Sequence, residues 1–198
     1  GWLATLRNNK DGSLQKLHAR VIVNAAGPWA KSCLFDVIKG LSEPLMRLVR
    51  GSHIVVPKLF NHDNAYIFQN SDRRIVFAIP YEQNFTMIGT TDEDFDGDLD
   101  SVAASTQEIN YLCETANRFF AQRISTDDII WTFSGVRPLL EDGSGHAEKV
   151  TRDYRLDLQK TENGAVALSI LGGKITTYRK LAEQAISKLS PIFDTKSK

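Results

Sequence analysis

The chain has 198 residues, of which 42% are hydrophobic, and its 24 Lys and Arg residues balance 24 Asp and Glu residues. Balanced charge argues against a nucleic-acid footprint or a strong electrostatic membrane anchor, and the apolar content is enough to bury a sizeable core. No apolar run approaches the roughly 20 residues that span a bilayer. Cys33 and Cys113 lack metal-ligand spacing, so we expect core thiols in a reducing compartment and no bound metal.

The first residues predict a β-hairpin. Two strand-like segments, Trp2 to Leu6 and Leu14 to Val23, flank a turn at 8–12 that is rich in Asn, Asp and Gly. This composition is typical of hairpin connections. We therefore expect the hairpin to enter a sheet whose other strands are not present in this chain.

A short β-branched strand is followed by small residues. Val21 to Val23 have no polar interruption, which is typical of a strand buried on both faces of a nucleotide-binding sheet. Asn24-Ala-Ala-Gly27 follows, and Pro28 suits the first turn of a helix over about 28–39. Small residues at the carboxyl end of a central strand leave room for a ligand. The alternative is a tight turn that binds nothing.

The middle of the chain predicts an α+β layer, residues 43–163, in which a helix covers mostly antiparallel strands. The capping box Ser105-x-x-Glu108 begins that helix. Its apolar residues recur at helical spacing, and they are Ile109, Leu112, Cys113, Ala116, Phe119 and Phe120. The expected strands lie at about 52–57, 65–69, 74–80, 85–90, 128–134 and 150–158.

Arg137 follows the aromatic-rich segment Ile129 to Phe133 in the sequence Ser-Gly-Val-Arg-Pro-Leu. A guanidinium beside such an apolar segment needs a partner, because burying a charge alone is costly. No carboxylate lies within three residues on either side. An anionic ligand and a distant salt bridge are both open as its partner.

Residues 171–179, Leu-Gly-Gly-Lys-Ile-Thr-Thr-Tyr-Arg, join a strand at about 165–171 to a helix at about 176–189. Two glycines allow close backbone approach, and a helix N-terminus offers N–H groups to electron-rich oxygens. Lys174 adds a point charge suited to a phosphate or an anionic cofactor ring. The alternative is an ordinary junction with a solvated lysine. The residues that this helix is expected to bury are Leu181, Ala182, Ala185, Ile186 and Leu189.

Six segments carry a family resemblance over nearly the whole chain. They are Val-Ile-Val-Asn-Ala-Ala-Gly-Pro-Trp (21–29), Gly-Ser-His-Ile-Val-Val-Pro (51–57), Ile-Gly-Thr-Thr-Asp (88–92), Trp-Thr-Phe-Ser-Gly-Val-Arg-Pro-Leu (131–139), Thr-Arg-Asp-Tyr (151–154) and Gly-Gly-Lys-Ile-Thr-Thr-Tyr-Arg (172–179). In this order they resemble the FAD-dependent glycerol-3-phosphate dehydrogenases, within the superfamily of D-amino-acid-oxidase-like flavoproteins. The first segment is shared across the superfamily, and the ordered later set is specific for the glycerol-3-phosphate branch.

The resemblance implies a fragment. No G-x-G-x-x-G occurs in the chain, although the family carries this dinucleotide fingerprint in an N-terminal βαβ unit. We therefore expect a substrate-binding domain with severed parts of an α/β FAD-binding domain, which binds no FAD when purified alone. The expected segments are 1–42 (β-hairpin, last parallel strand and helix) and 164–198 (strand, Gly-Gly-Lys loop and helix) for the FAD-binding domain, and 43–163 for the substrate-binding domain.

The resemblance also assigns roles to side chains. His53 matches a histidine that faces the substrate and is the candidate general base for its C2 hydroxyl; a strand-edge histidine bonded to backbone is the alternative. Arg137 matches an arginine that holds the substrate's oxygens. Arg152 matches a position that grips the phosphate, and a pair with Asp153 or Asp157 is the alternative.

The lysine that the family places over the active site matches Lys174, which would contact the phosphate or the flavin edge. The resemblance thus implies a catalytic set of His53, Arg137 and Lys174, to which substrate binding adds Arg152. Backbone N–H groups at the start of the last helix would face the flavin oxygen where charge accumulates on reduction. The expected FAD contacts are Ala25, Ala26, Gly27, Gly172, Gly173, Lys174, Ile175 and Thr176.

The implied activity is oxidation of sn-glycerol 3-phosphate to dihydroxyacetone phosphate, with hydride transfer to FAD and electrons passed to a membrane quinone. The alternatives are an oxidase that uses oxygen, another amine or amino-acid oxidase, and a fragment that serves only for folding or binding. Three cations suit a phosphate dianion better than a single carboxylate. We expect a cytoplasmic enzyme, peripheral to the inner membrane, without nucleic-acid partners, and a homodimer as one way to cover an exposed sheet edge.

Overall fold

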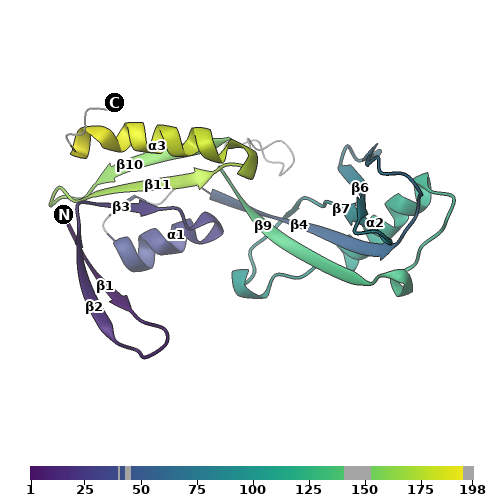
Figure 1. Ribbon diagram of the computed structural model, residues 1–198, viewed down its shortest axis with the longest axis horizontal. Helices are drawn as coiled ribbons and strands as arrows, with labels where there is room; N and C mark the ends of the chain where they lie inside the picture. Colours follow the sequence, from purple (N-terminus) through teal and green to yellow (C-terminus); the bar gives the residue numbers. More distant parts are fainter. Residues whose placement is uncertain (40, 43–45, 141–152, 194–198) are drawn as a thin grey trace. The chain divides into compact units, whose positions relative to one another are not determined.

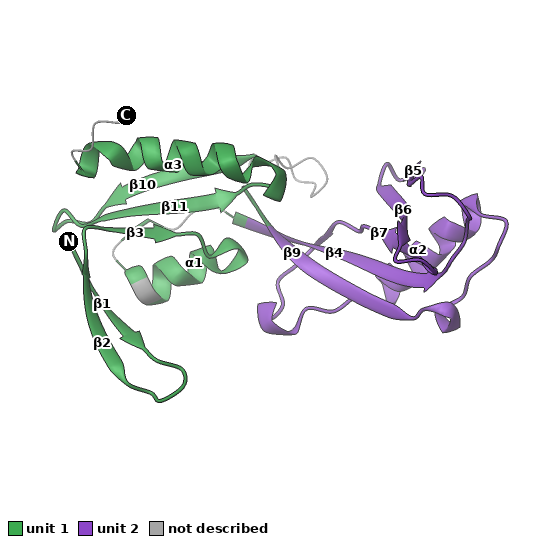
Figure 2. Ribbon diagram, viewed as in Figure 1, with its two compact units in different colours: residues 1–46, 138–142, 151–198 green, residues 47–137, 143–150 purple. Residues whose placement is uncertain are grey.

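The computed structural model describes residues 1–39, 41–42, 46–140 and 153–193. The chain divides into two compact units (Figure 2). Unit 1 is drawn from residues 1–46, 138–142 and 151–198, and unit 2 from residues 47–137 and 143–150. Each unit has a sheet with helical segments packed on it and its own buried cluster of apolar side chains.

Unit 1 contains a two-stranded hairpin and a three-stranded sheet (Figure 1). In the hairpin, β1 (Trp2–Arg7) pairs antiparallel with β2 (Leu14–Ala19), as the sequence predicts. The sheet has the order β10-β11-β3, in which β10 is antiparallel and β3 is parallel to β11. Its strands are β3 (Val21–Asn24), β10 (Tyr154–Lys160) and β11 (Val166–Gly172).

Helical segments cover both faces of this sheet (Figure 1). Leu168 packs against Ala185 of α3 (Tyr178–Phe193), whereas the neighbouring Ala167 packs against Leu34. Because successive side chains of a strand point to opposite faces, the two helical layers lie on opposite sides. The other helical segments among the described residues of unit 1 are η1 (Gly27–Trp29), α1 (Ala30–Ser32), the π-helix η2 (Cys33–Ile38) and η6 (Ile175–Thr177).

Two burial predictions for unit 1 were wrong. The sequence predicts a strand buried on both faces over Val21 to Val23, but Val23 is 48% exposed, and Val21 and Ile22 are only partly buried. Likewise Ile186 is 66% exposed and Ala182 is exposed. The helix packs on a sheet of three described strands, so the sheet buries only a narrow stripe of side chains along one face of the helix.

Unit 2 is built on one sheet with the order β5-β6-β7-β4-β8, and β9 also pairs with β4. The pairs of β4 with β7 and β8, and of β6 with β5 and β7, are antiparallel. This arrangement brings segments that are far apart in the sequence onto β4. The strands are β4 (Met46–Pro57), β5 (Tyr66–Gln69), β6 (Ile75–Tyr81), β7 (Phe85–Gly89), β8 (Glu93–Asp94) and β9 (Trp131–Leu140).

The helix α2 (Thr106–Phe119) packs on the sheet of unit 2. Its predicted capping box is confirmed: Ser105 Oγ accepts from the backbone N–H of Glu108 at 3.2 Å, and Glu108 Oε2 accepts from the N–H of Ser105 at 2.9 Å. Cys113 is buried in the core as a free thiol, and burial raises its pKa. The described residues of the unit also form two short 3₁₀ segments, η3 (Leu99–Ser101) and η4 (Thr126–Asp128).

The predicted α+β class, with antiparallel strands beside parts of an α/β layer, is confirmed. The compact units differ from the expected segments, because unit 1 includes residues 138–142 and 151–163, and its boundary with unit 2 falls at 46/47 in place of 42/43. β10, which the sequence puts within 43–163, accordingly pairs with β11 in unit 1. Which segments bind substrate and which bind FAD stays a prediction. Within the described ranges, the molecule has no helix long and apolar enough to cross a membrane.

Candidate active site

His53 lies on β4 opposite Gly89 of β7. Its imidazole stacks on the ring of Phe133, with ring centroids 4.7 Å apart and an interplanar angle of 2°. A Cβ at position 89 would overlap this imidazole, so the glycine makes room for the ring. Within the described part of the chain, Nδ1 of His53 is buried without a hydrogen-bond partner, which disagrees with a histidine bonded to backbone at a strand edge.

The electrostatic setting of His53 favours the neutral imidazole. Burial, and then the positive charge of Arg137, lower the pKa of His53 from its ordinary value near 6.5. A lowered pKa means that the ring carries no proton on its basic nitrogen near neutral pH. His53 can therefore accept a proton from a bound alcohol.

Arg137, on β9, is held by the residues that follow β7. Its Nη1 donates to Oδ1 of Asp92 at 2.6 Å and to the carbonyl oxygen of Thr91 at 3.5 Å, and its Nη2 donates to Oγ1 of Thr90 at 2.9 Å. The carboxylate partner is thus distant in sequence, as one of the two alternatives requires. A guanidinium has five N–H donors, so these contacts with described residues leave donors for an anionic ligand.

Three residues of this cluster escaped prediction as site residues: Gly51, Thr90 and Asp92. A Cβ at Gly51 would lie 2.5 Å from Nη2 of Arg137 and 2.6 Å from Oγ1 of Thr90. The glycine therefore leaves the space that the guanidinium occupies. The available signals were the Gly-Ser-His and Thr-Thr-Asp sequences, which the resemblance includes without assigning roles to these residues.

In unit 1 the small residues after β3 lie at the sheet edge where β11 also ends. β3 and β11 are parallel with Asn24 opposite Ser169, so their carboxyl ends reach the same edge. Asn24 is buried, its Nδ2 donates to the carbonyl oxygen of Ala30 at 2.9 Å, and its Oδ1 accepts from the N–H of Ala26 at 3.3 Å. Gly27 follows with φ 57°. The predicted loop of Ala25, Ala26 and Gly27 thus stands where open α/β sheets bind ligands.

The Gly-Gly-Lys loop continues from the carboxyl end of β11. Gly172 and Gly173 have φ values of 76° and 99°, which glycine adopts without steric cost. A Cβ at Gly172 would lie 2.7 Å from the carbonyl oxygen of Asp153, so this position requires glycine for space as well. Lys174 is exposed, and its backbone N–H donates to Oγ1 of Thr177 at 3.4 Å. The helical segment begins at Ile175, one residue before the predicted start.

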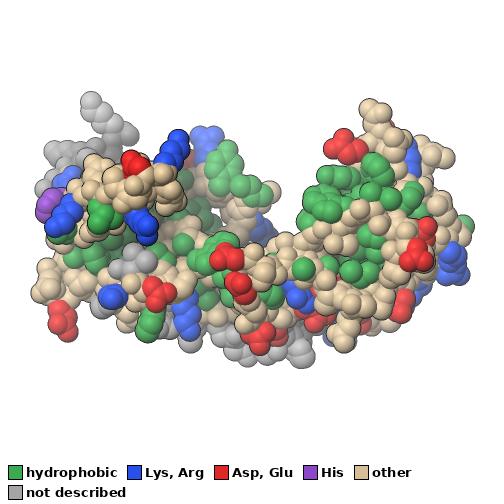
Figure 3. All heavy atoms as spheres, turned by 90° about the horizontal axis from the view of Figure 1, so that it is seen from below, with side chains coloured by type: hydrophobic (Ala, Val, Ile, Leu, Met, Phe, Trp, Pro, Cys, Tyr) green, Lys and Arg blue, Asp and Glu red, His purple; other side chains and the backbone are tan. Residues whose placement is uncertain are grey.

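Exposed hydrophobic side chains occur in both units (Figure 3). Directly after Lys174, Ile175 is 85% exposed and Tyr178 is 66% exposed, and Thr176 between them is also exposed. The first N–H groups of a helix have no partner within it. Apolar surface beside such N–H groups and two glycines fits a planar heterocycle with an electron-rich edge.

The predicted site residues fall into two groups. His53 and Arg137 come together in unit 2, whereas Lys174 and the expected cofactor contacts belong to unit 1. Arg152 lies outside the described residues. Convergence of these four side chains on one pocket therefore stays a prediction.

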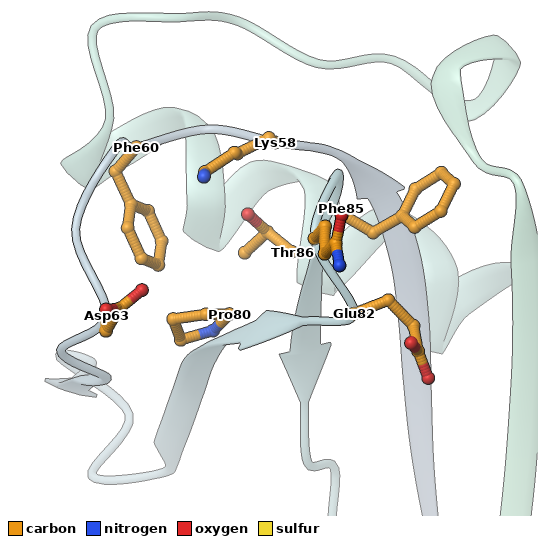
Figure 4. Close-up of a pocket in the computed structure, with 8 residues that line it drawn as sticks. Lys58, Phe60, Asp63, Pro80, Glu82, Phe85 and Thr86 are labelled. Carbon is orange, nitrogen blue, oxygen red and sulfur yellow. The ribbon is translucent and has the colours of Figure 1, made fainter.

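Unit 2 also has a pocket of about 220 Å³, around which Figure 4 shows the side chains. None of its lining residues is a predicted site residue, so it carries no part of the assignment. Among the described His, Cys, Asp and Glu residues, no group of three or more could hold a metal ion. The pocket is lined by Lys58, Phe60, Asp63, Pro80, Glu82, Gln83, Phe85 and Thr86.

Comparison with known proteins gives consistent matches along the chain. The model of a family described as FAD dependent oxidoreductase matches residues 3–179. A glycerol-3-phosphate dehydrogenase from Pseudomonas aeruginosa is 51% identical over 183 residues, which cover 92% of this chain and 36% of the relative. The D-erythritol 1-phosphate dehydrogenase from Brucella abortus is 46% identical over 193 residues, which cover 98% of this chain and 38% of the relative.

A solved structure matches almost the whole chain. It is the glycerol-3-phosphate dehydrogenase from Bacillus halodurans complexed with FAD, with a TM-score of 0.79 and 28% sequence identity. The match covers 99% of this chain and 37% of that chain. The chain thus spans 36–38% of the length of these three relatives.

Proposed function

This chain belongs to the FAD dependent oxidoreductase family, and we propose that the protein oxidises sn-glycerol 3-phosphate to dihydroxyacetone phosphate. Relatives of about 50% identity that are named for this activity support the proposal. The observation that carries it is the pairing in unit 2 of His53, whose pKa is lowered, with the Arg137 guanidinium. This pair supplies a proton acceptor and a fixed positive charge, which are the two functions that oxidation of a charged alcohol requires.

His53 acts as the general base in this proposal. The neutral imidazole accepts the proton of the C2 hydroxyl, and stacking on Phe133 holds the ring in one plane while it does so. Arg137 places its remaining N–H donors on the substrate oxygen and stabilises the negative charge that develops there. Asp92 and Thr90 fix the guanidinium before the substrate arrives, so little reorganisation accompanies the reaction.

FAD is the cofactor that the residues of unit 1 fit. The residues that would hold it are the small loop Ala25 to Gly27, the two glycines 172 and 173, and the backbone at the start of η6. Bound FAD supplies the acceptor for the hydride that leaves C2. Ile175 and Tyr178 offer apolar surface to a ring, and the helix N-terminus favours negative charge.

Positively charged side chains bind the phosphate of the substrate in this proposal. We propose that Lys174 and Arg152 bind it, in line with the exposure of Lys174 at a helix start and with the preference of phosphate for several positive partners. Arg137 contributes to the same charge balance. A single carboxylate, as in an amino-acid substrate, needs fewer cations.

The electron acceptor, the location and the oligomeric state are further parts of the proposal. We assign a membrane quinone as the acceptor, with oxygen as the alternative. We further propose that the full-length enzyme is cytoplasmic and peripheral to the inner membrane. A homodimer is the proposed oligomer.

A second substrate deserves a direct test, because a relative of 46% identity is named D-erythritol 1-phosphate dehydrogenase. D-erythritol 1-phosphate is also a phosphorylated polyol, so the same base and cations suit both substrates. A preference for one of the two substrates must therefore come from the space that the site offers beyond the reacting carbon. A comparison of the two substrates on one enzyme decides between them.

The test measures reduction of an artificial electron acceptor by the protein as its complete gene encodes it, supplied with FAD. The substrates are sn-glycerol 3-phosphate, D-erythritol 1-phosphate, glycerol and glycine. The proposal expects the highest kcat/KM with sn-glycerol 3-phosphate and little turnover of glycerol, which lacks the phosphate. A higher kcat/KM with D-erythritol 1-phosphate would make that compound the assigned substrate in place of sn-glycerol 3-phosphate. Turnover of glycine alone would refute the assignment.

A further inference from the structure

Glu108 carries more contacts than the capping of α2 requires. It is 3% exposed, and Oε2 alone accepts the capping bond from Ser105 and forms an ion pair with Nη2 of Arg50 at 2.8 Å. The other oxygen, Oε1, accepts from Oγ of Ser52 at 2.8 Å and from Oγ1 of Thr91 at 2.6 Å. A capping box uses one carboxylate oxygen. The second oxygen is therefore available to join β4 and the segment after β7 to the helix.

The two hydroxyl donors are chain neighbours of the candidate site. Ser52 precedes His53 on β4, and Thr91 lies between Thr90 and Asp92, the two side chains that hold Arg137. Ser52 and Thr91 are also joined directly, because the N–H of Ser52 donates to Oγ1 of Thr91 at 2.8 Å. The segments that present the imidazole and the guanidinium are thus tied to one carboxylate.

A third segment joins the same cluster through β9. Oγ of Ser52 lies 2.8 Å from Oγ of Ser134, within hydrogen-bond distance. Ser134 follows Phe133, on which His53 stacks, and precedes Arg137 on the same strand. Glu108 therefore has links to all three segments that bear on the His53–Arg137 geometry.

The carboxylate is charged in this buried place. Burial alone raises its pKa, but hydrogen bonds from Thr91, from the backbone of Ser105 and from Ser52 outweigh burial and hold the pKa of Glu108 below its ordinary value. An ionised acceptor makes stronger and shorter hydrogen bonds than a neutral one. The cluster is thus fixed by charge-assisted bonds rather than by packing alone.

We propose that Glu108 is a positioning residue, which acts through Ser52 and Thr91 to fix the distance and orientation between His53 and Arg137. The assignment rests on the proposed function for its catalytic meaning. Its structural content is independent of the substrate: loss of a hydroxyl bond at Oε1 loosens the segment 90–92, and Arg137 then moves relative to the imidazole. Arg137 is the charged group whose field, after burial, lowers the pKa of His53, and Asp92 is the carboxylate paired with Arg137.

Thr91→Val is the informative variant, because it keeps the shape of the side chain and removes the hydroxyl that joins Ser52 to Glu108. Thr91→Ser restores the hydroxyl. Thr115→Val is the matched control: Thr115 is equally buried, lies on α2, and its hydroxyl accepts from Nδ2 of Asn70 at 2.9 Å, outside the cluster. Glu108→Gln is a secondary variant and does not decide the proposal by itself, because removal of a buried charge can prevent folding.

The first readout is an NMR titration of the histidine side chains in the complete protein, with the His53 signal identified from a His53→Asn variant. The wild-type imidazole should titrate below 6.5. In Thr91→Val its midpoint should rise above the wild-type value while staying below 6.5, because burial persists but the loosened segment 90–92 lets Arg137 shift away from the ring. Thr91→Ser and Thr115→Val should keep the wild-type midpoint. An unchanged midpoint in Thr91→Val, or an equal rise in Thr115→Val, would overturn the proposal.

The second readout is the rate of flavin reduction by sn-glycerol 3-phosphate in a single turnover. Thr91→Val should slow this step by about tenfold or more, because displacement by about 1 Å costs on the order of 10²-fold, and Thr91→Ser should recover most of the rate. A wild-type protein that fails to react refutes the proposed function, and the titration still decides the role of Glu108. A variant with lower melting temperature but wild-type rate and midpoint would show a purely structural role.

Discussion

Gly51→Ala is the sharpest test of the geometry around Arg137. A methyl group at this position would lie 2.5 Å from Nη2 of Arg137, whereas ordinary contact of a Cβ begins at 3.4 Å, so the guanidinium must move by about 1 Å. A misplacement of about 1 Å in a catalytic group can lower the rate on the order of 10²-fold. This factor corresponds to about 2.7 kcal/mol of transition-state stabilisation, at roughly 1.36 kcal/mol per tenfold change.

The assay is kcat/KM for sn-glycerol 3-phosphate, measured with the complete protein and an artificial electron acceptor. Gly135→Ala is the matched control, because it lies two residues before Arg137 on β9 and its added Cβ would meet no atom within 4 Å. We expect a fall of about 10²-fold for Gly51→Ala and near wild-type activity for Gly135→Ala. Equal activity of both variants with unchanged melting temperatures would refute the reasoning, since Arg137 could then move without consequence.

Three more predictions concern catalysis and stability. Because burial and Arg137 lower the pKa of His53, the imidazole stays neutral down to below pH 6.5, so kcat/KM should decline with acid only below pH 6.5; an acid limb centred above 7 would contradict this. Gly172→Ala should lower the free energy of unfolding by about 1–3 kcal/mol or more. The loss should exceed that of Gly164→Ala, because both glycines have positive φ but only Gly172 faces the Asp153 carbonyl oxygen. Equal losses in urea unfolding would exclude that clash. Leu112→Ala should cost about 2–5 kcal/mol in the same assay, because the side chain is fully buried; a loss under about 1 kcal/mol would place this leucine outside the core.

Local signals predicted the start of α2, whereas β4 begins at Met46 and β9 extends to Leu140, beyond the expected 52–57 and 128–134. The capping box at Ser105 and Glu108 sets the start of α2, and its bonds lie within three residues, so the sequence contains all the information required. The hairpin at the start and the helix after the Gly-Gly-Lys loop are similar cases. Turn residues and helical spacing act through neighbours in the sequence, so they predict an element without knowledge of its distant partners.

Long-range pairing was the part that local patterns could not supply. Arg137 needs a partner by sequence alone, but the partner Asp92 is 45 residues away, and it is placed by the pairing of β4 with β7 and β9. The second role of Glu108 has the same origin, because Ser52 and Thr91 reach it only in the folded sheet. The exposure of Val23 and the place of β10 beside β11 likewise depend on which strands and helices meet.

The central claim is that His53, Arg137, Arg152 and Lys174 serve one ligand beside a flavin. A crystal structure of the complete protein with FAD and glycerol 3-phosphate tests it most directly. The account predicts that the imidazole of His53 lies within hydrogen-bond distance of the C2 oxygen, and that the three cations contact the same substrate or the adjacent flavin. A structure with these side chains on separate faces of the molecule would contradict it.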